Sequence, residues 1–357
     1  MPSSSRFLDG NEPFVQTVRG PISPDELGAT LVHEHLTTDW PAATGRTPAR
    51  IETVPIIRRV LECLERAHEA GVSAFVDCGM ERYGPTPLAL LCIALQTPIH
   101  IICTTGVFAQ DLLPPPSWAH LPSGPEEIAK YFIDAATYGQ EGSGVRPGVI
   151  KAASSGTGIT MIEANVFKGA AMAQRATGLP ITTHSWLTKW VEEQVDLLEE
   201  SGADLDRVII GHIGWGTTVK DSAMHRRLAK RGVMLGVDCI GSPARSIEEN
   251  AEIVLDLIEG GFASQILFSH DQTAYACGVL ELFHGETGWL KGDFTMASKQ
   301  LIPLLRKRGV DEKTLSGFMI DNPRRVLSVD PQRYPSAKTT LLPEIEVDPL
   351  APYDYGT

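Results

Sequence analysis

The sequence predicts an α/β fold, a single (β/α)8 TIM barrel, and three observations lead to it. Eight short apolar runs, most of them continuous rather than alternating, are typical of strands buried on both faces of a parallel sheet. Amphipathic segments with regularly spaced apolar residues separate these runs and predict helices. A barrel of this kind commonly takes about 250 residues or more, which the 357-residue chain supplies.

Strands and helices are expected to alternate along the chain. The expected strands are Ala29–His33, Ala74–Cys78, His100–Thr104, Gly148–Ala152, Pro180–His184, Arg207–Gly211, Val233–Asp238 and Ile266–Ser269. The expected helical segments are Pro55–Ala70, Pro87–Leu95, Pro125–Ala136, Glu163–Thr177, Lys189–Ser201, Asp221–Arg231, Ser246–Gly260, Phe294–Arg308, Asp311–Ile320 and Asp321–Leu327. Prolines at the first three helix starts and glycines just past several helix ends support these bounds. A doubly wound open sheet is the alternative, and its dinucleotide-binding form is disfavoured because no G-x-G-x-x-G follows the first strand.

Three connections are longer than the others: Leu36–Thr53, Gly106–Gly124 and Gln272–Asp293. Each follows the carboxyl end of an expected strand, which is the face on which barrel enzymes build their sites. We therefore expect the functional residues at this end of the barrel.

The domain organisation is expected to be simple. One barrel domain covers residues 15–327, after a polar extension of residues 1–14. A proline-rich tail, residues 328–357, is expected to pack on the barrel as irregular coil.

Composition excludes several classes of protein. The chain has 31 Lys plus Arg against 44 Asp plus Glu, a net charge of −13, which gives no general attraction to nucleic acid or anionic lipid. No apolar run reaches the ~20 residues of a membrane helix, and the start of the chain does not resemble a secretory signal. The six scattered cysteines form no disulfide framework. A cytoplasmic protein with a small-molecule substrate, and without nucleic acid or membrane as partner, is expected.

Six side chains of metal-binding or related type stand at the ends of five expected strands. They are His33, His35, Lys151, His184, His212 and Asp271. The first two form an H-x-H pair, so both point to the same face of one strand. Imidazole and carboxylate suit a borderline divalent ion, so a metal site at the barrel mouth is expected. His270 precedes Asp271 and points away from it, and for His270 a core role is favoured over a supporting one.

Lys151 is the unusual member of this set. An ammonium group would repel metal ions, and a buried lysine is expected to lose its proton. A neutral amine can add carbon dioxide and form a carbamate, here N6-carboxylysine, which can bridge two cations. Because six ligands with a bridging anion exceed what one tetrahedral ion needs, two divalent metal ions are expected. Zinc is the expected metal, while cobalt, manganese and iron share these ligands.

Several motifs carry a resemblance to a known family, in that family's order. They are Val15–Pro21, Leu27–Leu36, Gly148–Ala153, Gly178–His184, Arg207–His212, Arg231–Asp238 and Asn322–Leu327. Over residues 15 to 327 the sequence resembles the phosphotriesterase family, with its phosphotriesterase-like lactonases, in the amidohydrolase superfamily of metal-dependent hydrolases. The resemblance also implies a homodimer.

The resemblance implies a ligand assignment and a mechanism. His33, His35 and Asp271 would hold one metal, His184 and His212 the other, and carboxylated Lys151 would bridge them. A hydroxide between the metals would form near neutral pH, since coordination lowers the pKa of water toward about 7. It would attack the substrate carbonyl or phosphoryl group while Asp271 accepts its proton.

Two positions depart from the family pattern. Phosphate-ester specialists and many lactonases carry an acidic residue after the strand-6 histidine, and His or Arg after the aspartate that ends strand 7. This sequence has Trp215 and Cys239 there, which cannot relay protons as a carboxylate and an imidazole can. Organophosphate hydrolysis is therefore disfavoured as the native reaction.

Substrate contacts are expected from Phe108, Trp215, Cys239 and Arg82, and Tyr83 is a further candidate for the polar end of the substrate. An aromatic-walled pocket favours an apolar acyl chain or ring. The expected activity is hydrolysis of a carboxylic ester, lactone or amide, with the lactone favoured. N-acyl amide hydrolysis and organophosphate triester hydrolysis are the enzymatic alternatives, and a metal-containing binding protein without turnover is the non-enzymatic one.

Overall fold

The computed structural model describes residues 12–39, 54–80, 83–111, 124–186, 190–215, 221–243, 245–277 and 292–335. Within these ranges, nine strands form one parallel sheet in the order β10-β9-β8-β7-β6-β5-β4-β3-β11. The strands are β3 (Thr30–Asp39), β4 (Ala74–Asp77), β5 (His100–Gly106), β6 (Val149–Ser154), β7 (Ile181–Ser185), β8 (Val208–Ile210), β9 (Met234–Val237), β10 (Ile266–Phe268) and β11 (Thr273–Cys277). Because β11 continues the chain from β10 and pairs with β3, the sheet closes on itself. The predicted (β/α)8 barrel is confirmed, with β10 and β11 together as its eighth strand.

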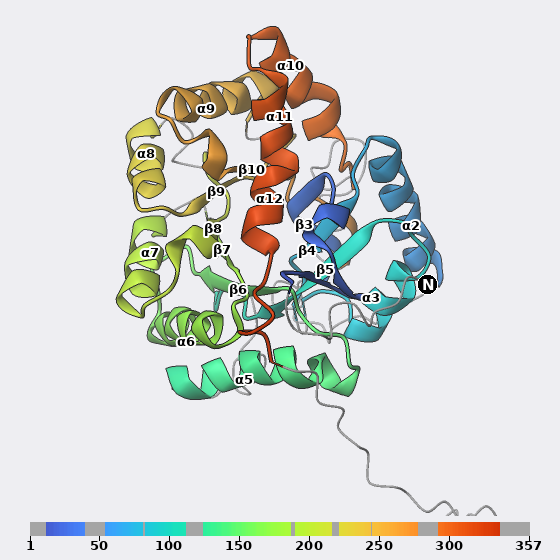
Figure 1. The fold of residues 1–357 in the computed structure, drawn as a ribbon, viewed down its shortest axis with the longest axis vertical. Coiled ribbons are helices and arrows are strands. Elements are labelled where there is room, and N and C mark those ends of the chain that lie inside the picture. The colour runs from blue at the N-terminus through green and yellow to red at the C-terminus, as the bar shows by residue number, and fades with distance from the viewer. Residues whose placement is uncertain are drawn as a thin grey trace, which may run out of the picture.

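Helices surround the sheet as a ring, except for the last helix, α12 (Asp321–Leu327), which lies across the centre of the view (Figure 1). They are α2 (Val54–Glu69), α3 (Pro87–Ala94), α5 (Pro125–Tyr138), α6 (Met161–Thr177), α7 (Val191–Glu200), α8 (Ser222–Lys230), α9 (Ile247–Glu259), α10 (Ile302–Lys307), α11 (Glu312–Met319) and α12 (Asp321–Leu327). A π-helical segment, η9 (Ala297–Leu301), leads into α10. Local sequence explains several starts: Thr160 and Ser246 each form a capping box with a glutamate three residues later, ahead of α6 and α9.

The predicted starts of two of the long loops were wrong, because both segments are strand in the structure. Strand β3 continues to Asp39, and β11 occupies Thr273–Cys277, although both segments were expected to be loop. These two stretches pair with each other, from Thr273 opposite His35 to Cys277 opposite Asp39. Each therefore supplies the backbone partners that the other needs, which a single-strand pattern does not indicate. Residues 40–53, 112–123 and 278–291 of the three loops lie outside the described residues.

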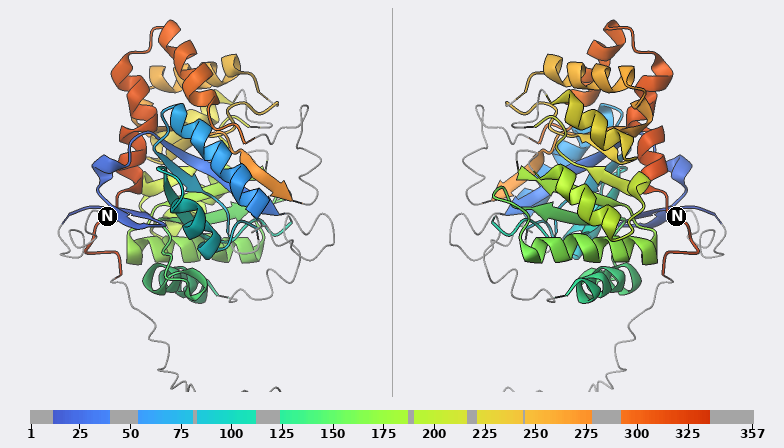
Figure 2. Two further views of the ribbon diagram at one scale, coloured as in Figure 1. Left: turned by 90° about the vertical axis from the view of Figure 1, so that its right-hand side faces the viewer. Right: turned by 90° about the vertical axis from the view of Figure 1, so that its left-hand side faces the viewer.

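A short antiparallel hairpin, β1 (Val15–Thr17) and β2 (Gly20–Ile22), precedes the barrel and was not predicted. It lies at the amino-terminal end of the strands together with α12, and the strand arrows in Figure 2 point away from this end. The side chains that fill the barrel interior here form one apolar cluster: Val15, Leu27, Val32, Ala74, Val76, Cys78, Ile102, Val149, Ile209, Met234, Leu267, Val326 and Leu327. This end of the barrel is therefore a packed core and not a pore.

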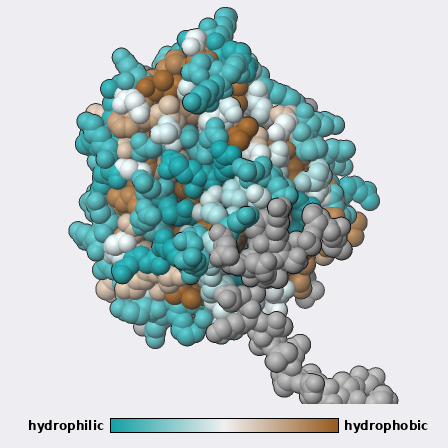
Figure 3. All heavy atoms as spheres, in the orientation of Figure 1, coloured by the Kyte–Doolittle hydropathy of each residue, from teal (hydrophilic) through white to brown (hydrophobic). Residues whose placement is uncertain are grey.

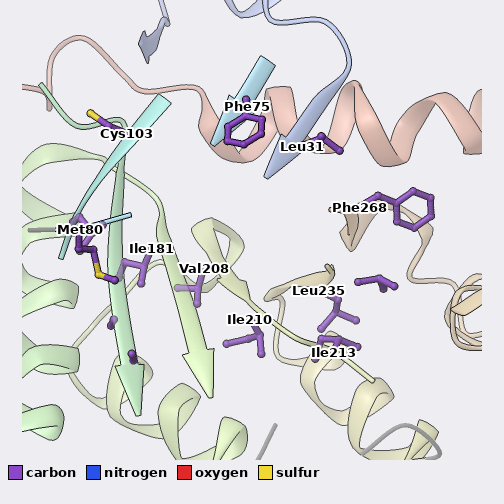
Figure 4. Packing of buried hydrophobic residues seen from close by; sticks show 14 of the residues in the cluster. Leu31, Phe75, Met80, Cys103, Ile181, Val208, Ile210, Ile213, Leu235 and Phe268 are labelled. Carbon is purple, nitrogen blue, oxygen red and sulfur yellow. The ribbon is translucent and has the colours of Figure 1, made fainter. Parts of the chain in front are cut away.

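A second apolar cluster fills the space between the strands and the helices. Figure 4 shows part of it, with Leu31, Phe75, Leu235 and Phe268 directed away from the strands on which they lie. Along β9 and β10 the two clusters alternate, since Met234 and Leu267 face inward while Leu235 and Phe268 face the helices. This alternation explains why the strands appear in the sequence as continuous apolar runs.

The first residues of the tail pack against the barrel. Val329 pairs with Phe14 in an antiparallel bridge, and the Tyr334 hydroxyl donates to the carbonyl of Pro147 at 3.0 Å. The Arg146 guanidinium lies 4.2 Å from the centre of the Tyr334 ring. Residues 336–357, and with them most of the predicted tail, lie outside the described residues. The boundaries assigned to the N-terminal extension, the barrel domain and the tail stay a prediction.

Among the described residues, no helix has the length and apolar character needed to cross a bilayer. On the face drawn in Figure 3, hydrophilic residues predominate and hydrophobic ones are scattered between them.

Candidate metal centre

The six side chains singled out in the sequence come together at the carboxyl end of the barrel strands. His33, His35, Lys151, His184 and His212 are all buried, and the side chain of Asp271 is 17% exposed. They belong to β3, β6 and β7 or lie just past β8 and β10. Five strands thus bring nitrogen and oxygen donors into one enclosed cluster.

Strand β3 supplies the H-x-H pair. Its register with β4 shifts between Leu31 and Glu34, and this irregularity lets the consecutive residues Val32 and His33 both face the barrel interior. Asp271 joins the pair from the far side of the barrel seam: its Oδ1 lies 3.3 Å from Nε2 of His35 and 3.7 Å from Nε2 of His33. Asp271 has φ +51°, a left-handed conformation that is uncommon outside glycine.

Lys151 lies on β6 and reaches the same cluster. Its Nζ is 2.7 Å from Nε2 of His33, and its side chain is completely buried. Among the described residues, no carboxylate oxygen lies within 4 Å of Nζ. The amine therefore faces the histidines without an acidic partner of its own.

His184 and His212 form the other side of the cluster. Nδ1 of His184 lies 2.7 Å from Nε2 of His212, and the two rings meet edge to face. His184 is the penultimate residue of β7, whereas His212 follows β8 in a left-handed conformation with φ +61°. This backbone turn directs the His212 ring back into the barrel mouth.

Asp238 supports two of these histidines, and the sequence reasoning gave it no role in the site. Its Oδ1 accepts from His212 Nδ1 at 3.0 Å and from the His212 backbone N–H at 2.8 Å, and its Oδ2 lies 3.0 Å from His33 Nδ1. The carboxylate fits because residue 211 is glycine: a Cβ there would lie 3.2 Å from Asp238 Oδ2 and only 2.4 Å from the Thr183 carbonyl. The signal was available, since Asp238 ends an expected strand as Lys151 does.

Charge and burial set the protonation of the cluster. Burial, with Lys151 nearby, lowers the pKa of His33 to about 4, and burial beside His212 lowers the pKa of His184 well below its usual value. Burial opposes ionisation of Asp238, but His212 and His33 hold its pKa well below the usual range. Likewise, burial acts to lower the pKa of His212, yet Asp238 and Asp271 raise it. His33 and His184 are therefore neutral near pH 7, which is the form that binds metals.

The donor set fits one or more divalent cations. The ring nitrogens that face the cluster are Nε2 of His35, 3.3 Å from Asp271 Oδ1, and Nδ1 of His184, 2.7 Å from Nε2 of His212. Imidazole nitrogens and a carboxylate oxygen that converge at these distances form a suitable ligand set for a divalent cation. Three groups of side chains place single ligand atoms within 4.8 Å of one another: His33, His35 and Asp271; His33, His212 and Asp238; and His212, Cys239 and Asp271.

The predicted substrate residues lie around this cluster. The Phe108 ring is 4.7 Å from the His184 ring, and the Trp215 ring is 5.8 Å from the His212 ring. Cys239 Sγ lies 3.7 Å from His212 Nδ1, and burial raises the pKa of its thiol well above its usual value. Cys239 is therefore a neutral, fully buried neighbour of His212. Arg82 lies outside the described residues.

Two further aromatic residues lie next to Phe108 and Trp215. Tyr83 stacks on Phe108 with ring centres 4.6 Å apart, and its ring also meets His35 edge-on at 5.5 Å. Trp186 meets Trp215 edge-on at 5.3 Å. Trp186 was missed in the sequence, although it stands two residues after His184, where the period of a strand predicts the same face.

Comparisons with known proteins find relatives that cover most of the chain. The chain is 30% identical over 335 residues to a phosphotriesterase homology protein of Mycobacterium tuberculosis, covering 88% of this chain and 97% of the relative. It is 27% identical to an aryldialkylphosphatase of Saccharolobus solfataricus, covering 86% and 97%, and 26% identical to an N-acetyltaurine hydrolase of Salmo salar, covering 88% and 97%.

Solved structures show the same architecture. A mutant of the PTE-like lactonase of Deinococcus radiodurans superposes with a TM-score of 0.78 at 29% identity, covering 88% of this chain and 99% of the lactonase. The family model described as "Phosphotriesterase family" matches residues 13–327, nearly all of the chain. The protein is therefore a member of the phosphotriesterase family and has the hydrolase fold of that family.

Proposed function

We propose that the protein is a binuclear metal-dependent hydrolase of carboxylic esters, with a lactone as the favoured substrate. One observation carries the proposal: six donor side chains from five strands, or from just past them, share a single enclosed cluster, in which neighbouring donor atoms lie as close as 2.7 Å. Family relatives named as a lactonase and as an N-acetyltaurine hydrolase support a carbonyl substrate.

The metal-binding roles follow from the two sides of the cluster. His33, His35 and Asp271 would hold one ion, and His184 and His212 the other, with zinc as the expected metal. A carbamate on Lys151 would bridge them, and it would replace a buried ammonium that is costly to desolvate without an acidic partner. When bound, two divalent ions would supply a water of lowered pKa and would polarise the substrate carbonyl.

The residues of the chain would then hold and move protons. Asp271 is ionised, since His212, His35 and His33 lower its pKa although burial opposes this. It is also the most exposed of the six donors, so its carboxylate can take a proton from attacking water and release it to the leaving group. Asp238 would keep the rings of His33 and His212 in their ligand orientations, the usual role of a carboxylate behind a metal-bound histidine.

The walls of the site favour an apolar substrate. Tyr83, Phe108, Trp186 and Trp215 surround the histidines with aromatic surface, which excludes water and packs against an acyl chain or a ring. Neither Trp215 nor the neutral thiol of Cys239 can relay protons as a carboxylate or an imidazole can. A lactone or another ester suits this site, because its hydrolysis needs one proton transfer to the leaving oxygen, which Asp271 could supply without a relay.

A second candidate is an N-acyl amide whose amine part carries an acid group. Arg245 is 3% exposed, and its Nη1 donates to the carbonyl of Ile213, the residue after His212, at 2.8 Å. Its Nε and Nη2 have no hydrogen-bond partner among the described residues. A carboxylate or sulfonate on the substrate could take up these donors. The likeness to an N-acetyltaurine hydrolase adds to this candidate.

Hydrolysis rates on a substrate panel would test both candidates. The panel holds an aliphatic lactone, an aryl ester, an N-acyl amino acid and a phosphate triester, each tested with metal-reconstituted protein. The main proposal expects the highest kcat/KM on the lactone, with little effect of Arg245→Met. The second expects the highest value on the N-acyl amino acid, with a loss in Arg245→Met on that substrate alone. Metal-loaded protein that turns over none of the four would favour a binding protein instead.

The homodimer stays a prediction. Analytical ultracentrifugation of the full chain across a concentration series would test it, and a monomer throughout would contradict it.

A further inference from the structure

Glu34 is a buried carboxylate that the proposed chemistry does not use. It lies on β3 between His33 and His35, and its side chain is 0% exposed. Its two neighbours face the metal centre, whereas the Glu34 carboxylate contacts the backbone on either side of Asp271. Because a buried carboxylate is costly unless donors satisfy it, its partners indicate its role.

Three N–H groups donate to Glu34. The His270 backbone N–H reaches Oε1 at 2.7 Å, His270 Nδ1 reaches the same oxygen at 2.6 Å, and the Gln272 backbone N–H reaches Oε2 at 2.9 Å. The residue between His270 and Gln272 is Asp271. One carboxylate therefore holds the chain immediately before and immediately after the proposed proton acceptor.

The bonding of His270 fixes which of its nitrogens carries the proton. The backbone N–H of Ala297 points to His270 Nε2 at 3.0 Å. A backbone N–H can only donate, so Nε2 accepts and the ring proton lies on Nδ1, facing Glu34. Glu34 thus accepts all three hydrogen bonds. His270 connects it to Ala297, the first residue of η9.

Asp271 is a residue that needs such support. Its φ of +51° lies in the left-handed region, which costs free energy in a residue other than glycine and persists where the surroundings enforce it. Its own N–H donates to the His33 carbonyl at 3.2 Å, and the His35 N–H donates to the Gln272 carbonyl at 2.9 Å. These contacts lie at the seam between β10 and β3, where the sheet closes.

We infer that Glu34 and His270 form a positioning pair that holds Asp271 in the orientation from which its carboxylate reaches His33 and His35. The inference rests on the proposed function, because it gives the pair an effect on metal binding and turnover in addition to its effect on stability. Neither residue touches the substrate. Both act through the backbone on either side of Asp271.

Glu34→Gln tests the pair with almost no change in volume. The amide keeps one acceptor oxygen but turns an NH₂ group toward N–H donors, so at least one of the three bonds is lost. Loss of such support behind a metal ligand typically costs about 10- to 100-fold in metal affinity or activity. We expect this loss in kcat with KM nearly unchanged, and a matching change in the visible spectrum of the cobalt-loaded protein.

Glu163→Gln is the matched control. Glu163 is also fully buried and also accepts three bonds, from the Gln110 N–H at 2.8 Å, the Ser155 hydroxyl at 2.5 Å and the Thr160 N–H at 2.9 Å. It lies at the start of α6, away from Asp271 in the sequence. This variant should lose a similar amount of stability in urea unfolding while its cobalt spectrum and kcat stay at the wild-type values.

Two substitutions of His270 separate its two bonds. In His270→Asn the side-chain amide can still donate to Glu34 but no longer reaches Ala297, whereas in His270→Gln the amide oxygen can accept from Ala297 and the donor to Glu34 is lost. We expect near wild-type kcat and cobalt spectrum for Asn, and a loss like that of Glu34→Gln for Gln. If Glu34→Gln does not fold, these two variants still test the inference.

The outcomes separate this inference from the function on which it rests. If Glu34→Gln and His270→Gln lose only stability, as Glu163→Gln does, the pair is structural and the inference is wrong while the hydrolase stands. If wild-type protein binds no metal and hydrolyses nothing, the proposed function itself has failed.

Discussion

The two ends of the barrel are built from the same strands and differ completely in character. On β6, Val149 packs in the apolar interior cluster, and two residues later Lys151 faces the histidines. On β9, Met234 belongs to the apolar cluster, and Asp238, just past the strand, supports two imidazoles. A few residues along one inward face thus change the environment from packed hydrocarbon to titratable donors.

This contrast separates stability from chemistry within one fold. The amino-terminal end gains free energy from apolar burial, closed by Val326 and Leu327 of α12. The carboxyl end buries charged and polar groups at a cost, and two imidazole nitrogens stay unsatisfied among the described residues. Substitutions at one end should therefore act on stability, and at the other on metal binding and turnover.

Lys151→Ala should have the largest effect on turnover. It should disrupt metal binding at the carboxyl end of the barrel and leave the apolar packing of the amino-terminal end unchanged. It removes the proposed bridge, so most of the bound metal should be lost and kcat/KM should fall by more than about 100-fold, beyond what supporting residues cost. Metal analysis and steady-state kinetics measure both. Short carboxylates such as formate should restore part of the activity by filling the bridging position. Full activity in the variant would refute the bridge.

Asp271→Asn should come next. The amide can still offer an oxygen but cannot accept a proton, so kcat should fall by about 100-fold or more, the usual range for a lost general base. Metal binding should weaken only moderately, and competition with a chelator measures this. Equal and mild losses of metal and turnover would remove the proton role of Asp271.

Leu267→Ala tests the opposite case, a substitution in the apolar core at the amino-terminal end of the barrel. Leu267 is fully buried in the interior cluster, so its truncation should lower the free energy of unfolding by about 2–5 kcal/mol in urea titrations. Metal content and kcat below the unfolding transition should match wild type. A variant that loses metal in proportion to its stability would show that the two ends are not separable.

The smallest expected effect is on the pH dependence of the free energy of unfolding of the metal-free protein, when His33 is replaced. The pKa of His33 is lowered to about 4, chiefly by burial, so below pH 6.5 the unfolded chain takes up a proton there that the folded chain does not. His33 therefore contributes a loss of stability as the pH falls from about 6.5 to about 4. Urea unfolding at several pH values should give a weaker pH dependence for His33→Asn than for wild type. Equal slopes would contradict the lowered pKa.

The comparison also explains how far the sequence predicts the fold. The barrel strands were predictable because their two faces meet different apolar clusters, which leaves a continuous apolar signal. Strand β11 was not, because Thr273–Cys277 is a strand only through its pairing with β3. The hairpin of Val15–Thr17 with Gly20–Ile22 is too short to leave a periodic pattern.

The site was predictable to the same extent. Lys151 and His184 stand at or next to the ends of the expected strands Gly148–Ala152 and Pro180–His184, so position alone assigns them to the barrel mouth. His212 and Asp271 lie beyond their strands, and their left-handed backbone conformations, which direct them inward, leave no signature in non-glycine residues. Asp238 also ends an expected strand, so its place at the barrel mouth could have been predicted, but its contact with two imidazoles depends on the space left by Gly211, which is a three-dimensional property.

The most direct test of the central claim is a crystal structure of zinc-reconstituted protein with anomalous data at the zinc edge. The account predicts two peaks per chain, one among His33, His35 and Asp271 and one at His184 and His212, with added density on Lys151 Nζ. No zinc peak at the barrel mouth under saturating zinc would contradict it. So would an unmodified Lys151 side chain with no zinc ion next to it.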